Sequence, residues 1–332
     1  MKLAPIFSNG AIFPAHKNIC IFGEAKGIVT VSLAQKTVCT AVKDGKFRAF
    51  LPPFPYGGPF ELSIRDEDES LIFSDIYFGE VYLMSGQSNM QLKLHETNFP
   101  QDKYFDDPLL RVFSTDRIQD TEVYHSGDGW MSVSKENAAD LTAIGILTGE
   151  ELRRNKDIPI GIITCYQGAS VIESWLPKEF SKFSPLSIPD SEKFSDHFDD
   201  IFGQWNHSGD LYDAMLMQIV PYPLSGIVWY QGESDASDGE ACIYKEELLA
   251  LINVWRSDFL DPTLPFYIIQ IADCDDRPWP CWHAIQKAQA DAADEGEKIY
   301  CIESRDVCES SCIHPTQKYE LSRRIANRIC RT

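Results

Sequence analysis

From about residue 76 onward, short apolar segments alternate with longer segments of helical periodicity, and this alternation constrains the fold more than any other feature of the chain. In the segment 138–154, for example, Leu141, Ile144 and Leu147 recur at spacings that place them on one helix face. Strands separated by helices indicate a parallel sheet with helices on both sides. We expect strands at 81–85, 111–114, 158–164, 226–230, 266–271 and 299–303, and helices at 138–154 and 244–259.

The N-terminal part of the chain has a different pattern. Short alternating runs such as Val29–Leu33 and Phe47–Leu51 are separated by turn signals that include Asp44-Gly45. This pattern predicts a small antiparallel β-sandwich. Because a length of 332 residues suits two domains, we expect a β-sandwich-like domain at 1–75 and a larger α/β domain at 76–332.

Charge and hydropathy exclude two classes of partner. The chain has 30 Lys and Arg against 50 Asp and Glu, a formal charge of -20 that would repel nucleic acid and anionic membrane surfaces. No run of eighteen apolar residues occurs, and the stretch that begins at Lys2 breaks at Ser8-Asn9-Gly10 before a signal-like apolar segment develops. We therefore expect neither a signal peptide nor a membrane span.

Ten cysteines are spread along the chain without C-x-x-C pairs. With no secretory signal, we interpret them as reduced thiols, and we expect a cytoplasmic protein. Cys301, Cys308, Cys312 and His314 could in principle hold zinc, but their spacings match no common finger or ribbon. The sequence therefore predicts buried free cysteines and no metal.

Polar residues follow several predicted strands, where an open parallel sheet binds its ligands. Ser88 comes after the strand at 81–85, Gly168 after the one at 158–164, and Gln231 and Glu233 after the one at 226–230. His314 lies beyond the last strand. We expect these four segments to converge at one edge of the sheet.

Four blocks of the sequence resemble those of the sialate O-acetylesterase-like carbohydrate esterases of the SGNH hydrolase superfamily. The blocks are Gly86-Gln87-Ser88-Asn89-Met90, Gly168 with Ile172-Glu173-Ser174-Trp175, Trp229-Tyr230-Gln231-Gly232-Glu233-Ser234, and Ile313-His314-Pro315. The resemblance covers nearly the whole chain, since the sandwich-like N-terminus also resembles the β-domain that precedes the catalytic domain in many members. It implies an SGNH-type three-layer α/β domain with a parallel sheet.

The resemblance also implies acyl transfer to a serine, with no metal and no organic cofactor. Ser88 would be the nucleophile and His314 the base that takes its proton. The backbone N–H groups of Ser88 and Gly168 and the side-chain amide of Gln231 would stabilise the oxyanion. Outside such a block, a serine or a glycine in a turn is usually only a turn residue. Met90 stands where a G-x-S-x-G elbow needs glycine, which argues against an α/β-hydrolase.

The C-terminal segment predicts a helix that begins directly after His314. Pro315 suits the first helical position, and Leu321, Ile325 and Ile329 share a face. This arrangement would place the imidazole near the positive end of the helix, where its neutral form is favoured.

The third member of a catalytic triad is where the sequence departs from the family pattern. Relatives usually carry an aspartate two or three positions before the histidine, but Cys312 and Ser311 occupy those positions. Glu233 is the preferred substitute, although it could instead be a buried carboxylate that ties loops together. Asp306 and Glu309 are weaker candidates, and a Ser–His dyad is the remaining option.

Two functions follow from these residues. The first is a serine esterase that removes O-acetyl groups from carbohydrate, either a sialic acid or an acetylated plant oligosaccharide, through an acyl-enzyme. The alternative is a catalytically impaired carbohydrate-binding protein of the same fold. The segment 180–208 predicts a long surface loop that could shape a substrate cleft. Trp175, Trp279 and Trp282 could offer aromatic faces to sugars, although such tryptophans more often lie in a core or at a rim.

Overall fold

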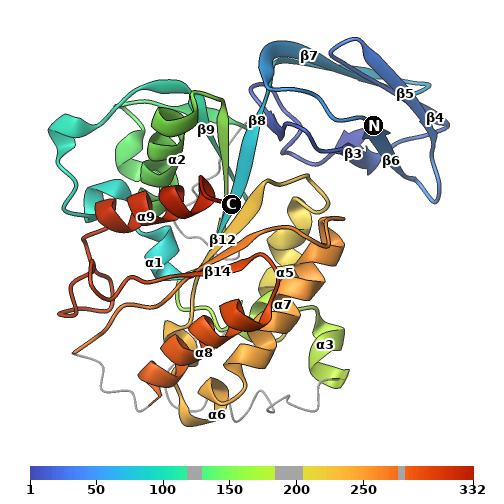
Figure 1. The fold of residues 1–332 in the computed structure, drawn as a ribbon. Helices are drawn as coiled ribbons and strands as arrows, with labels where there is room; N and C mark the ends of the chain where they lie inside the picture. The colour runs from blue at the N-terminus through green and yellow to red at the C-terminus, as the bar shows by residue number, and fades with distance from the viewer. Residues whose placement is uncertain (118–128, 184–204, 276–280) are drawn as a thin grey trace.

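The computed structural model describes residues 1–117, 129–183, 205–275 and 281–332. Six parallel strands form the central sheet in the order β9-β11-β8-β12-β13-β14, and β10 pairs antiparallel with β9 at its edge (Figure 1). The strands are β8 (Ser70–Gly86), β9 (Asp107–Ser114), β10 (Met131–Val133), β11 (Ile160–Tyr166), β12 (Gly226–Tyr230), β13 (Phe266–Ile269) and β14 (Ile299–Ile302).

Helices cover both faces of this sheet. The helices α2 and α9 pack together on one face, and α7 and α8 pack together on the other (Figure 1). The α-helices are α1 (Ser88–Gln91), α2 (Ala143–Lys156), α3 (Lys178–Phe183), α5 (Asp210–Ala214), α6 (Asp238–Ala241), α7 (Tyr244–Asp258), α8 (Trp282–Glu295) and α9 (Tyr319–Ile329). The predicted three-layer α/β architecture is confirmed. Within the described ranges, none of these helices has the length and apolarity needed to cross a membrane.

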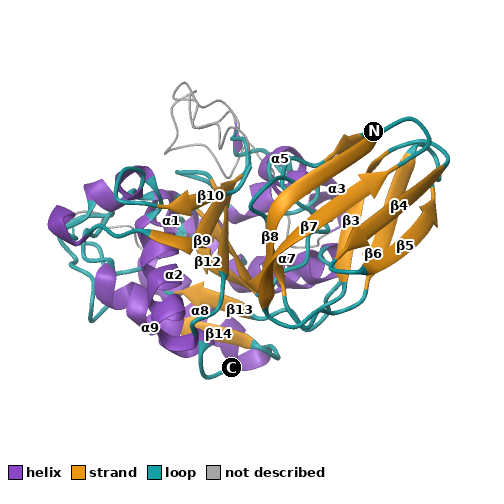
Figure 2. Ribbon diagram, turned by 90° about the horizontal axis from the view of Figure 1, so that it is seen from above, coloured by secondary structure: helices purple, strands orange, loops and turns teal. Residues whose placement is uncertain are grey.

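Antiparallel strands build most of the N-terminal part, as predicted (Figure 2), whereas β2 pairs parallel with β8. One small sheet has the order β1-β3-β6, and β4 pairs antiparallel with β5 and β7. In β6, Phe47, Ala49 and Leu51 are buried while Lys46 and Arg48 are exposed, so alternate residues face the core. The strands are β1 (Lys2–Leu3), β2 (Ile12–Pro14), β3 (Ile19–Glu24), β4 (Ile28–Leu33), β5 (Lys36–Ala41), β6 (Lys46–Leu51) and β7 (Gly57–Arg65).

One strand belongs to both parts of the molecule. β8 is 17 residues long; its first half pairs antiparallel with β7, and its second half pairs parallel with β11 and β12. The boundary expected between residues 75 and 76 therefore falls inside a continuous strand. The division into two domains stays a prediction, while β4, β5 and β7 join the central sheet through β8.

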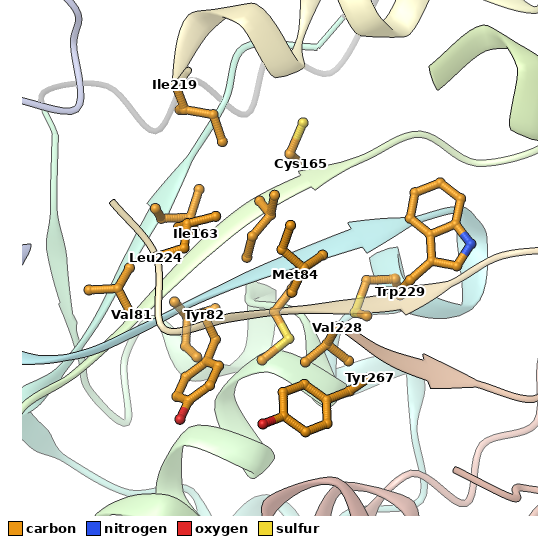
Figure 3. Close-up of a cluster of buried hydrophobic side chains, with 14 of the residues drawn as sticks. Val81, Tyr82, Met84, Ile163, Cys165, Ile219, Leu224, Val228, Trp229 and Tyr267 are labelled. Carbon is orange, nitrogen blue, oxygen red and sulfur yellow. The ribbon is translucent and has the colours of Figure 1, made fainter. Parts of the chain in front are cut away.

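The core of the larger part lies on both sides of the central sheet. Side chains of successive residues alternate between the two faces, so that Tyr82 and Met84 lie on one side and Val81 on the other (Figure 3). Trp255 of α7 forms a fully buried cluster with Trp175 and Trp229, with ring centroids 5.5 to 6.2 Å apart. A role for Trp175 in sugar stacking is therefore wrong, because its ring is covered by core residues. Trp279 and most of the predicted loop at 180–208 lie outside the described residues.

The end of β8 requires a glycine, which provides a test of the fold. Gly86 has φ +131°, and a Cβ there would overlap the backbone of Tyr230. We expect Gly86→Ala to lower the free energy of unfolding by about 3 kcal/mol, from backbone strain and overpacking together. Gly45→Ala is the matched control, because Gly45 also has positive φ but a Cβ there would meet no atom within 4 Å. Urea unfolding should show a cost of about 1 kcal/mol for that control; equal costs would contradict the described turn.

Candidate active site

Ser88 lies at the carboxyl end of the central strand. β8 ends at Gly86, and Ser88 is the first residue of the short helix α1. The N–H of Gln87 donates to the carbonyl oxygen of Tyr230 at 2.9 Å, which fixes the turn against the end of β12. Ser88 is half-buried, so its hydroxyl is held in place and still reachable from solvent.

His314 meets this serine from the far end of the chain. The distance between His314 Nε2 and Ser88 Oγ is 2.8 Å, a hydrogen bond between residues 226 positions apart. The histidine is exposed. An imidazole at this distance can accept the hydroxyl proton and so turn a weak nucleophile into a strong one. The predicted meeting of Ser88 and His314 is therefore present in the structure.

The expected helix directly after His314 is wrong. α9 begins at Tyr319, and the intervening turn is held by Glu309, whose carboxylate accepts hydrogen bonds from the N–H and hydroxyl of Thr316 and from the N–H of Gln317. His314 therefore does not lie at a helix N-terminus, and the helix dipole gives no account of its protonation. Glu309 is one of the weaker candidates for the triad acid, and in this structure both of its carboxylate oxygens accept hydrogen bonds from this turn.

The other weaker candidate, Asp306, forms a bidentate ion pair with Arg324, with a distance of 2.6 Å for each carboxylate oxygen.

The residues considered for zinc, Cys301, Cys308, Cys312 and His314, do not form a metal site. Among the residues that the structure describes, no group of three or more His, Cys, Asp or Glu side chains is placed to hold a metal ion.

Gly168 lies beside Ser88. A Cβ built on Gly168 would come within 3.7 Å of the Cβ of Ser88. The N–H of Gly168 donates to Gln91 Oε1 at 3.0 Å, so this amide points toward α1 and has a side-chain oxygen as its acceptor. The N–H of Ser88, at the start of α1, has no acceptor among the described residues. The position of both amides suits the predicted oxyanion site, although their role stays a prediction.

The side chain of Gln231, predicted to stabilise the oxyanion, makes its hydrogen bonds to other protein groups. Its side chain is fully buried, and Nε2 donates to the carbonyl oxygen of Ser170 at 2.9 Å and to the carboxylate of Asp235. Its Oε1 accepts from the hydroxyl of Tyr244 at 3.0 Å. Both amide hydrogens are thus used to tie loops together, and an oxyanion role for Gln231 would require it to leave these partners. Burial and the nearby carboxylates raise the pKa of Asp235 well above its usual range.

Glu233 is buried and contacts Asn89, the residue that follows Ser88. It begins the short 3-10 helix η7 (Glu233–Asp235), and its Oε1 accepts a hydrogen bond from Asn89 Nδ2 at 2.6 Å. In the described part of the chain, Oε2 has no hydrogen-bond partner and Glu233 makes no hydrogen bond to His314. Burial raises the pKa of Glu233. Its assignment as triad acid stays a prediction, whereas its contact with Asn89 is directly observed.

Two residues around the site were not identified from the sequence. Gln91 contacts Gly168, and Lys318 is fully buried with its Nζ 2.7 Å from Asn89 Oδ1. A signal for Lys318 exists, because it lies three and seven positions before Leu321 and Ile325. Helical periodicity would have placed it on the apolar face.

The fold is that of the SGNH-type carbohydrate esterases. Residues 78–331 match the family described as carbohydrate esterase, sialic acid-specific acetylesterase. The chain belongs to this family. A solved carbohydrate acetylesterase from Xanthomonas citri is 26% identical and superposes with a TM-score of 0.82, over 98% of this chain and 73% of that one.

The chain is also similar to curated sialate O-acetylesterases. The chain is 28% identical to the sialate O-acetylesterase of Pongo abelii and 27% identical to that of Homo sapiens, and each alignment covers 94% of this chain. The chain spans 66% of the length of each of these relatives.

The raised pKa of Glu233 predicts how stability changes with pH. The folded protein keeps a proton on Glu233 at pH values where the unfolded chain, with a pKa of about 4.3, has lost it. This group therefore contributes a loss of stability as pH rises from about 4.3 through the raised folded pKa. Glu233→Gln removes that contribution.

Urea unfolding of both proteins between about pH 4 and pH 7 measures the difference. We expect the stability of Glu233→Gln, relative to wild type, to rise with pH over this window. Parallel pH profiles for the two proteins would contradict a buried carboxyl with a raised pKa.

Proposed function

We propose that this chain is a serine-dependent esterase that removes O-acetyl groups from carbohydrate. The observation that carries the proposal is the 2.8 Å contact between Ser88 Oγ and His314 Nε2 at the carboxyl edge of the sheet. Family membership supports the substrate class, since the matched family is that of sialic acid-specific acetylesterases.

The chemistry follows from the positions of these two side chains. His314 Nε2 accepts the proton of Ser88 Oγ as that oxygen attacks the acetyl carbonyl. The imidazolium then returns the proton to the sugar oxygen, which leaves as an alcohol. In the second half of the reaction His314 takes a proton from water, the resulting hydroxide attacks the acetyl-serine, and the proton returns to Ser88 Oγ as acetate leaves.

The negative charge that develops on the carbonyl oxygen requires donors that are already in place. The N–H groups of Ser88 and Gly168 are the donors proposed for this role. Because the Gly168 N–H donates to Gln91 Oε1 in this structure, the substrate oxygen would replace that side-chain oxygen. Gln91 thereby keeps the amide satisfied when no substrate is bound.

The rival function is a carbohydrate-binding protein that has lost catalysis. Its support is the absence of an aspartate before His314, where Ser311 and Cys312 stand. The hydrogen bond between Ser88 and His314 favours the enzyme, because a binding protein has no need for that alignment.

The cytoplasmic location stays a prediction from the cysteine pattern.

Ser88→Ala tests the nucleophile. We expect this variant to lose about 1,000-fold or more of kcat for 4-nitrophenyl acetate and to keep its thermal stability, because only the reacting oxygen is removed. Ser132→Ala is the matched control, since Ser132 is exposed and its hydroxyl donates to the carbonyl oxygen of Pro108 on strand β9. An inactive wild type, or an active Ser88→Ala, would favour the rival function.

Acetate release from two carbohydrates tests the substrate class. We expect faster release from O-acetylated sialic acid than from acetylated xylo-oligosaccharides, in agreement with the family that the chain matches. The ratio of the two kcat/KM values is the quantity to compare. A preference for the acetylated plant oligosaccharide would move the assignment to that substrate and leave the reaction unchanged.

A further inference from the structure

A buried polar cluster adjoins the residues that carry the contact between Ser88 and His314. It consists of Asn89, Glu233 and Lys318, whose exposed fractions are 1%, 1% and 0%. Three polar side chains in this position carry a large desolvation cost unless their hydrogen bonds are made. Their partners therefore indicate what the cluster is for.

The carboxamide of Asn89 joins the two halves of the candidate site. Its Nδ2 donates to Glu233 Oε1 at 2.6 Å and to the carbonyl oxygen of Ile313 at 2.9 Å, and its Oδ1 accepts from Lys318 Nζ at 2.7 Å. Lysine only donates, whereas a backbone carbonyl only accepts. The carboxamide thus has one orientation in which every contact is satisfied.

Lys318 fixes the oxygen end of this carboxamide. Its Nζ lies 5.0 Å from the centre of the Tyr230 ring, so that the ammonium rests on an aromatic face as well as on Asn89. Burial lowers the pKa of Lys318 to about 8. Lys318 also caps the N-terminus of α9, since its carbonyl oxygen accepts from the N–H of Ser322 at 2.9 Å. The cluster therefore connects α9 to α1.

We propose that Asn89, held by Lys318 and Glu233, is a positioning residue that sets His314 against Ser88. Asn89 follows Ser88 in α1, and Ile313 precedes His314, so a single carboxamide fixes the distance between the two segments that carry the reacting side chains. The proposal rests on the proposed function, because it assigns Asn89 a role only through the Ser88–His314 pair. It gives Glu233 a role that requires no contact with the imidazole.

The rate at which a fluorophosphonate probe labels Ser88 tests this proposal without any assumption about the sugar. We expect Asn89→Ala to slow labelling about 10- to 100-fold, because a displacement of about 1 Å at a reacting pair costs about that much. Asn89→Asp keeps the size of the side chain and the contact with Lys318 but loses both donors. It should show a similar loss, with folding checked by circular dichroism and thermal unfolding.

A matched control separates positioning from stability. Asn137→Ala also removes side-chain hydrogen bonds to backbone groups, namely those to Ser132 and Ser134. These contacts lie in the loop after β10, so this variant should label at the wild-type rate even if it unfolds at a lower temperature. The decisive comparison places Asn89→Ala in a His314→Ala background, where a residue that acts only through His314 should cause no further loss.

The outcomes are distinct. Wild-type labelling rates in both Asn89 variants, or an equal loss in the presence and absence of His314, would overturn the positioning role. A wild type that is not labelled at Ser88 would overturn the nucleophile assignment and the positioning role together. A wild type that is labelled but hydrolyses no acetyl ester would refute the proposed function alone, and the effect of Asn89 on labelling would still decide the present proposal.

Discussion

The hydrogen bond between Ser88 and His314 depends on the way in which a parallel sheet ends. All six parallel strands end at the same edge, and the turns that follow β8 and β14 carry the serine and the histidine from positions 226 residues apart. Side chains alone could not hold such a contact, because both would be free to rotate in solvent. The Asn89 carboxamide, with its partners Lys318 and Glu233, ties the two turns together next to the reacting residues.

The fold could be predicted to a large extent because its signals are local. The strand expected at 226–230 has those bounds, and the helix expected at 244–259 differs from α7 by one residue. β8 is longer than the apolar run at 81–85 because its first half pairs with β7, and that pairing brings together segments whose sequences carry no mark of each other. The helix start after Pro315 was wrong for a similar reason. Glu309 binds the backbone at 316–317 and keeps it out of the helix.

In the candidate site, too, the features that depend on local sequence could be predicted, and those that depend on tertiary packing could not. Ser88, Gly168 and His314 could be placed from strand ends and from motif blocks, because those features fix where a backbone turn lies. The partners of Gln231 and Glu233 could not be predicted. Both side chains are buried, and a buried polar group takes whichever partner the packing presents, here Asp235 and Asn89. Glu233 is therefore described better by its contact with Asn89 than by analogy with the missing aspartate.

The most direct test of the account is to trap the acyl-enzyme. Wild type mixed with excess acetyl ester, quenched in acid and digested with protease, should yield a peptide that carries one acetyl group on Ser88. The His314→Ala variant should deacylate slowly, so acetyl-Ser88 formed by chemical acetylation should also persist long enough to be detected in that variant. Detection of acetyl-Ser88 that disappears in Ser88→Ala is the predicted result. Ester hydrolysis without acetyl-Ser88, or with the acetyl group on another residue, would contradict the account.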